Sequence, residues 1–268
     1  MKKVFVFFLL FALCSNFSLV KSQGRLDGVK DNIESGSSGS GSSNSLDYSG
    51  LLADPYILES MIELTGYALY YGAYKLPFGA FEKRNFYDYP YANGNHGEYS
   101  DSFIDLKNKK SQFSFSNTLS LSADNIIANK TSAQFRFTKT LGVDINYLQF
   151  YEERPFDDLN MSSAMLNFYR IREKNVTGYW GVGASHVGGE LQVTGIAYNL
   201  GLDIYWGKPI STELYWKQSY ANKTPLNEFK FMANLHIKKS AVGIGVVNHN
   251  LAGSNIAMLA ASFKLILH

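Results

Sequence analysis

An alternation of apolar and polar side chains runs through residues 112–267 and constrains the fold more than any other feature. It comes in runs of roughly ten residues with turn residues between them, as in the strands of membrane barrels. Because successive side chains of a strand point to opposite faces, each run predicts a strand with one apolar and one polar face. Such a series is typical of a transmembrane β-barrel, where one face contacts lipid and the other the lumen.

The number and quality of these runs define the expected architecture. The clearest run places Phe229, Phe231 and Leu235 on one face and Glu228 and Lys230 on the other. The ten runs span residues 112–122, 131–138, 142–152, 161–172, 176–186, 190–206, 210–219, 227–237, 241–248 and 256–267. We therefore predict an all-β fold, an antiparallel up-and-down transmembrane β-barrel of about ten strands with a short N-terminal helical segment.

The connections between the runs alternate in length. Four are short, at 139–141, 172–175, 207–209 and 238–240, and they alternate with longer ones at 123–130, 152–160, 221–227 and 248–255. Only the short connection at 187–190 breaks this alternation. Bacterial barrels have short periplasmic turns and longer outer loops. This pattern predicts that both ends of the barrel sequence face the periplasm.

The first 22 residues are typical of a secretory signal peptide. Two lysines precede the ten apolar residues 4–13, too few to cross a bilayer as a helix, and cleavage is expected before Gln23. A lipoprotein signal with Cys14 as the lipidated residue is the alternative. Cys14 is the only cysteine, so the exported chain would have neither disulfides nor thiol chemistry.

Three further regions follow the signal peptide. Residues 23–48 are rich in Ser and Gly and predict a flexible linker. Residues 49–107 predict a helical and irregular segment, in which an amphipathic helix over 54–74 packs on or inside the barrel. Residues 108–268 form the predicted barrel.

The strand pattern over about 112–267 resembles the small outer-membrane β-barrel proteins of Gram-negative bacteria, especially those with an N-terminal extension. The resemblance rests on the pattern and on no diagnostic motif. One departure is the last residue, His268, where such proteins often carry an aromatic residue that the assembly machinery reads. The resemblance implies an outer-membrane location, with outer-membrane lipid and the assembly machinery as partners and a periplasmic partner for the N-terminal segment.

A ten-stranded barrel predicts a narrow or plugged lumen. Eight strands are just filled by their own side chains, and aqueous channels appear at about 16–18 strands. The side chains expected to line the lumen carry both signs of charge; they are Arg136, Asp144, Asp203, Glu213, Lys217, Glu228, Lys230 and Lys264. Mutual pairing of these charges is the simpler interpretation, and a path for a small solute or ion is the alternative.

Catalytic and cofactor signatures are weak. None of the histidines has the serine two residues later that outer-membrane phospholipases and lipid A deacylases carry, and no dinucleotide or Walker motif is complete. We assign no catalytic residue, metal ligand or cofactor. His96, Glu98 and Asp101 could ligate a metal, but a polar loop explains them better. The 25 Lys and Arg nearly balance the 23 Asp and Glu, so no nucleic-acid partner is expected.

Three functions are compatible with these sequence features. The first is a non-enzymatic structural or interaction barrel, or a narrow solute pathway, in the outer membrane. The second is a lipid-modifying outer-membrane hydrolase, with His186 and His236 as the first residues to test. The third is a soluble secreted barrel that binds a ligand in an apolar interior, which requires the apolar face of each strand to point inward.

Overall fold

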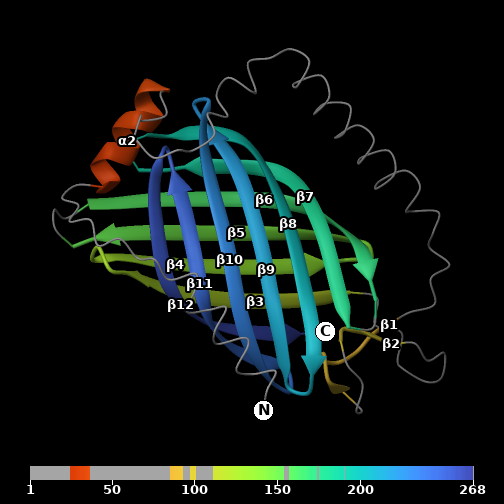
Figure 1. Ribbon diagram of the computed structural model, residues 1–268. Helices are drawn as coiled ribbons and strands as arrows, with labels where there is room; N and C mark the ends of the chain where they lie inside the picture. Colours follow the sequence, from red (N-terminus) through yellow and green to blue (C-terminus); the bar gives the residue numbers. More distant parts are fainter. Residues whose placement is uncertain are drawn as a thin grey trace.

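The chain folds into a closed antiparallel barrel of ten strands (Figure 1). The computed structural model describes residues 25–36, 85–92, 97–100, 111–153, 157–173, 175–189 and 191–267. The barrel strands are β3 (Gln112–Ser122), β4 (Ile126–Arg136), β5 (Leu141–Glu152), β6 (Asp157–Arg172), β7 (Val176–Val187), β8 (Val193–Gly207), β9 (Ile210–Ala221), β10 (Thr224–Ile237), β11 (Ser240–Leu251) and β12 (Ser254–Leu267). Each strand pairs with its neighbours in sequence, and β12 pairs with β3. The predicted ten-stranded up-and-down barrel is confirmed.

The two ends of the barrel differ in what lies against them. We call the end with Gln112, Leu267 and the turns 137–140, 173–175, 208–209 and 238–239 the terminal mouth. The opposite end, with the turns 123–125, 222–223 and 252–253, is the helix mouth, because helix α2 (Arg25–Ser35) lies there. A two-stranded sheet of β1 (Asn85–Phe86) and β2 (Tyr99–Ser100) lies at the terminal mouth (Figure 1).

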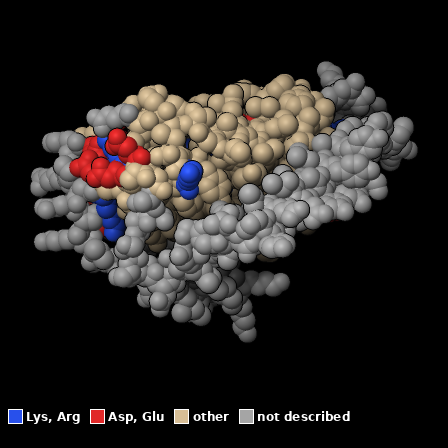
Figure 2. All heavy atoms as spheres, turned by 90° about the horizontal axis from the view of Figure 1, so that it is seen from above, with Lys and Arg blue, Asp and Glu red and all other residues tan. Residues whose placement is uncertain are grey.

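The outward face of the barrel is apolar and the middle of the inward face is polar. Phe229 and Leu235 are 45% and 46% exposed, whereas Glu228 on the opposite face of the same strand is 2% exposed. Seen from above in Figure 2, charged side chains gather at the end that carries α2, and the flank of the barrel shows few. This distribution is the reverse of the one that a soluble ligand-binding barrel requires.

The prediction of longer loops at one end is wrong. β4 begins at Ile126 and β10 at Thr224, so the connections at the helix mouth are as short as 222–223 and 252–253. The sequence hid these strand ends because the two-residue period is disturbed there. At the start of β4 both the buried Ile126 and the outward Ile127, 39% exposed, are apolar. At the start of β10 the inward Leu226 is apolar and the outward Asn227 is polar, the reverse of the middle of the strand.

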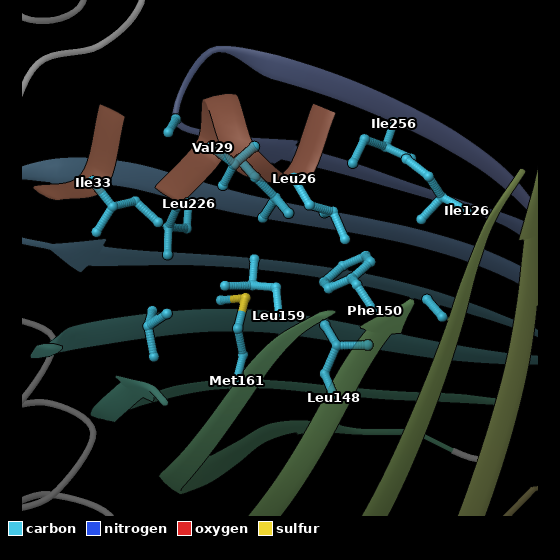
Figure 3. Packing of buried hydrophobic residues seen from close by; sticks show 14 of the residues in the cluster. Leu26, Val29, Ile33, Ile126, Leu148, Phe150, Leu159, Met161, Leu226 and Ile256 are labelled. Carbon is cyan, nitrogen blue, oxygen red and sulfur yellow. The ribbon is translucent and has the colours of Figure 1, made fainter. Parts of the chain in front are cut away.

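Helix α2 explains the apolar inward face at the helix mouth. Its buried residues Leu26, Val29 and Ile33 recur at helical spacing and form one cluster with residues from the barrel interior (Figure 3). Among the latter are Ile126, Phe150, Leu159, Met161, Leu226 and Ile256. The helix corrects the prediction of a flexible linker over 23–48. Three apolar residues are too few to reveal a helix in sequence, and packing supplies its stability.

Other predictions for the N-terminal region lie outside the described residues. They include the signal peptide over 1–22, the remainder of the linker and the helix over 54–74. Within the part of the chain that the structure describes, no helix is long and apolar enough to cross a membrane.

Close packing between strands predicts a specific stability effect at Gly245 of β11. A Cβ atom added there would lie 2.0 Å from the carbonyl oxygen of Phe231 in β10. We expect Gly245→Ala to lower the free energy of unfolding by about 1–3 kcal/mol, because the backbone of β10 has to shift. Urea denaturation followed by tryptophan fluorescence measures the change. Gly207→Ala is the control, since nothing lies within 4 Å of a Cβ atom there; equal midpoints for both variants would contradict the prediction.

Candidate functional site in the lumen and at its mouths

Ion pairs fill the interior of the barrel, and one of them connects opposite walls. Lys130 of β4 lies 2.5 Å from Glu228 of β10, and Lys217 of β9 lies 3.5 Å from the other oxygen of the same carboxylate. Lys230 and Glu213 form a second pair. Since β4 and β10 are not neighbours in the barrel, the Lys130–Glu228 pair crosses the lumen.

The structure places the eight predicted lumen residues inside the barrel. Asp144, Asp203, Glu213, Lys230 and Lys264 line a central cavity of about 50 Å³. Arg136, Lys217 and Glu228 are almost fully buried, with exposures of 1%, 4% and 2%. Because a water molecule needs roughly 10–15 Å³ of such volume, the cavity has room for a few waters and no larger solute.

Two members of this charge network were not among the residues predicted from sequence. Lys130 falls in a predicted outer loop, although its inward position continues the two-residue period of Ile126 and Ala128 in β4. Glu98 precedes the barrel in sequence and enters the interior beside β2. No local pattern could place Glu98 there, because its position depends on the docking of a separate sheet.

At the terminal mouth, Arg136 attaches the β1–β2 sheet to the barrel wall. Its guanidinium lies 2.7 Å from the Glu98 carboxylate and also donates to the hydroxyl of Tyr99. It lies 3.8 Å from the ring centroid of Tyr169, and Thr177 donates to Glu98 at 3.2 Å. Burial alone would raise the pKa of Glu98, but the charges of Arg136 and Lys264 outweigh it and lower that pKa below its ordinary value. Glu98 is therefore a buried, ionised carboxylate.

Tyr91 closes the same mouth next to His236. The Tyr91 hydroxyl donates to the carbonyl oxygen of Ile210 at 2.5 Å, and its ring meets the imidazole edge-on at 5.3 Å between centroids. Burial raises the pKa of Tyr91 to about 12, so the phenol is neutral and donates this hydrogen bond at physiological pH.

The two histidines singled out for a hydrolase lie at opposite ends of the barrel. His236 Nε2 lies 2.7 Å from the hydroxyl of Ser211, the distance of a nucleophile–base pair. However, His236 Nδ1 is buried without a hydrogen-bond partner among the described residues, whereas a catalytic histidine needs an orienting group at that position. His186 is near the helix mouth and bonds Thr194 at 3.0 Å. The structure does not bring the two histidines into one site.

At the helix mouth, side chains of the barrel cap both ends of α2. The Glu152 carboxylate accepts hydrogen bonds from the backbone N–H groups of Arg25 and Leu26, at 3.3 and 3.0 Å. Asn222 donates to the carbonyl oxygens of Ile33 and Glu34, both at 2.9 Å. These contacts satisfy polar groups that a helix leaves unpaired at its ends, so the barrel fixes the position and direction of α2.

Charged contacts hold the sides of α2. Arg25 lies 2.7 Å from Asp124, and Lys30 pairs with Asp157. Asp27 also approaches Asp157. The hydrogen bond between the two carboxyl groups raises the pKa of Asp27, and the negative charge of Asp157 acts in the same direction. The docked helix therefore contains one unfavourable contact between like charges.

The described residues contain no group of three or more His, Cys, Asp and Glu side chains arranged to hold a metal. Of the three residues considered for a metal site, Glu98 pairs with Arg136, while His96 and Asp101 lie outside the described residues.

Comparisons with known proteins return barrels of similar architecture at low similarity. No protein-family model matches the sequence, and no curated protein matches it either. Similar solved structures include the N-terminal β-barrel domain of Pseudomonas aeruginosa OprF, with a TM-score of 0.34 and 10% identity over 59% of this chain and 96% of that one. LpxR from Salmonella typhimurium has a TM-score of 0.36 and 11% identity over 58% and 83%. The Yersinia pestis outer membrane protein Ail has a TM-score of 0.34 and 14% identity, and the match covers 58% of this chain and 99% of that one. At these values the likeness carries no argument about the function of this chain.

The Glu98–Arg136 pair predicts non-additive losses of stability. Glu98→Gln leaves a buried guanidinium without its counter-charge and should cost about 3–5 kcal/mol of unfolding free energy. Arg136→Met should cost a similar amount, and the double variant should lose less than the sum of both, as a denaturant double-mutant cycle would measure. Lys238→Gln in an exposed turn of the same mouth is the control. Additive losses would show that the two side chains do not act as a pair.

The Asp27–Asp157 contact predicts one contribution to the docking of α2 that is favourable in acid and is lost as the pH rises. A raised pKa in the docked state means that docking gains from protonation of Asp27 and weakens as pH rises through and above 3.8. Asp27→Asn should therefore slow tryptic cleavage after Lys30 at neutral pH. At low pH, where trypsin is inactive, hydrogen exchange of the α2 amides is measured instead, and the variant and the wild type should then exchange at the same rate. Glu34→Gln, farther along α2, is the control. Faster cleavage of the Asp27 variant at neutral pH would refute this account.

Proposed function

We propose that this chain is an integral outer-membrane protein with a closed lumen, a structural or interaction barrel rather than a solute pathway. The outward apolar face supports the membrane location, because side chains such as Ile145, Ile244 and Leu259 are 58%, 69% and 56% exposed. The barrel strands have 11 to 16 residues, and about 9–11 tilted residues cross a bilayer. Closure of the barrel pairs the backbone polar groups that lipid cannot satisfy.

The observation that carries the closed lumen is the small charged cavity at the centre of the barrel. Its volume is about 50 Å³, and the buried Lys130–Glu228 ion pair beside it crosses from wall to wall. Helix α2 covers one mouth, and the β1–β2 sheet with Tyr91 lies at the other. A solute would have to displace three layers, namely α2, the ion pairs of the lumen, and the β1–β2 sheet with Tyr91. Specific contacts hold each of them.

Two alternatives have less support. A hydrolase at Ser211 and His236 has the right distance between nucleophile and base, but within the described residues the pair lacks an orienting group and lies beneath Tyr91. A soluble ligand-binding barrel would expose its large apolar side chains to water and bury charges instead, an arrangement opposed by the hydrophobic effect. Outer-membrane lipid, the assembly machinery and a periplasmic partner remain proposed partners.

Conductance in planar bilayers tests the closed lumen. The wild-type protein should give no discrete steps, and neither should a variant in which Leu26→Ala and Ile33→Ala weaken the docking of α2, because the ion pairs still block the centre. The positive control adds Lys130→Ala, Lys217→Ala and Glu228→Ala to that variant, together with Tyr91→Ala, Glu98→Ala and Arg136→Ala to release the terminal mouth. It removes all three layers and should produce steps. Steps from the wild-type protein would overturn the proposal in favour of a solute pathway.

A further inference from the structure

An apolar groove indents the outward face of the barrel between β6 and β10, close to the terminal mouth. Its volume is about 420 Å³, within the range of about 300–1,000 Å³ that is typical of small-molecule sites. Its lining includes Ile171, Trp180, Leu200, Trp216 and Phe229, with Arg170 as the charged member. The lining of the groove shares Tyr179 and Tyr215 with the lumen cavity but is mostly apolar, whereas the lining of that cavity is dominated by polar and charged residues.

A β-bulge and a glycine create this groove. The register between β6 and β7 shifts between Tyr169 and Ile171, which leaves Arg170 without a partner in β7. Ile171 pairs with Gly178, and a Cβ atom added to Gly178 would lie 2.9 Å from the Ile171 side chain. The absence of a side chain at position 178 therefore lets Ile171 lie close against β7, and a larger residue there would push Ile171 toward the groove.

Aromatic side chains lie in the groove and near the terminal mouth. Trp180 stacks on Phe168 with 4.6 Å between ring centroids. Trp206, two residues from the turn at 208–209, is 66% exposed. Tryptophans are enriched at both membrane–water interfaces, because their rings are apolar and their N–H groups are polar. The groove thus begins at the interface and extends toward the apolar band.

Arg170 adds a positive charge to the otherwise apolar lining of the groove. Its side chain is exposed at the rim of the groove, and the described residues offer it no hydrogen bond or ion pair. A guanidinium presents several N–H donors in a plane and binds phosphate oxygens in pairs. An exposed arginine above an apolar groove, at the level of the headgroups, is complementary to one phosphate attached to one hydrocarbon chain.

We propose that this groove is a specific phospholipid-binding site, in which an acyl chain fills the groove and Arg170 binds the phosphate. The inference rests on the proposed membrane location, since only there is the outward face bathed in lipid. The groove offers about 420 Å³ and one cation, which fits one acyl chain and one phosphate. The expected ligand is therefore a phospholipid rather than lipid A, which carries several acyl chains and two phosphates.

Native mass spectrometry of the full-length protein in detergent micelles, titrated with phosphatidylglycerol, tests this site. The wild-type protein should retain one phospholipid. Arg170→Gln should weaken binding about tenfold or more, because a charge-assisted hydrogen bond to phosphate is lost. Gly178→Leu should abolish retention by filling the groove. The matched controls are Lys208→Gln, an exposed cation at the same mouth, and Ala261→Leu, an outward position on β12; both should bind like the wild type.

Flotation with phosphatidylglycerol vesicles separates the two proposals. If the wild-type protein does not float with vesicles, the membrane location fails and the lipid site fails with it. If all variants float but bind phosphatidylglycerol equally, the barrel is a membrane protein and the site is refuted. Stronger retention of lipid A than of phosphatidylglycerol, lost in Arg170→Gln, would refute the proposed ligand. If Gly178→Leu no longer floats because it does not fold, the binding of phosphatidylglycerol by Arg170→Gln tests the site alone.

Discussion

Pairing between β12 and β3 is the constraint on which the rest of the structure depends. It joins the last strand to the first, so that each barrel strand has a hydrogen-bonded neighbour on both sides. A barrel closed in this way has no open edge, which permits an apolar outer surface that would otherwise invite aggregation. Closure also creates an interior, and every charge placed there needs a partner because water is largely excluded.

The interior meets this requirement with long-range ion pairs rather than with apolar packing throughout. Lys130 reaches Glu228 across the lumen, and Arg136 reaches Glu98, which arrives from outside the barrel. Buried pairs of this kind contribute little net stability, but removing one partner costs much. They therefore act as specific connections that set which walls face each other and where the β1–β2 sheet docks. The apolar cluster beneath α2 supplies burial at the helix mouth.

The sequence predicted the number of strands and the inward positions of charges such as Glu228 and Lys230, because both follow from a period of two residues. It failed where the polarity of the two faces changes. Near the helix mouth, Ile126, Leu159 and Leu226 face inward in the cluster beneath α2. Asp158 and Asn227 lie on the outward face there, so the pattern is reversed and strand ends were read as loops. Glu98 and α2 were missed for another reason. Their positions depend on contacts with residues more than thirty positions away, such as Arg136 and Glu152, and single-sequence patterns contain only local information.

One N-terminal segment closes both mouths, since α2 lies at the helix mouth and the β1–β2 sheet at the terminal mouth. The two closures differ in strength. Helix α2 buries three apolar side chains and its ion pairs are partly exposed, and such pairs contribute little. The β1–β2 sheet is held by a buried carboxylate and guanidinium. Release of α2 should therefore come first, and the ion pairs of the lumen would still block the barrel. The main barrier to solutes is therefore the set of lumen ion pairs rather than helix α2.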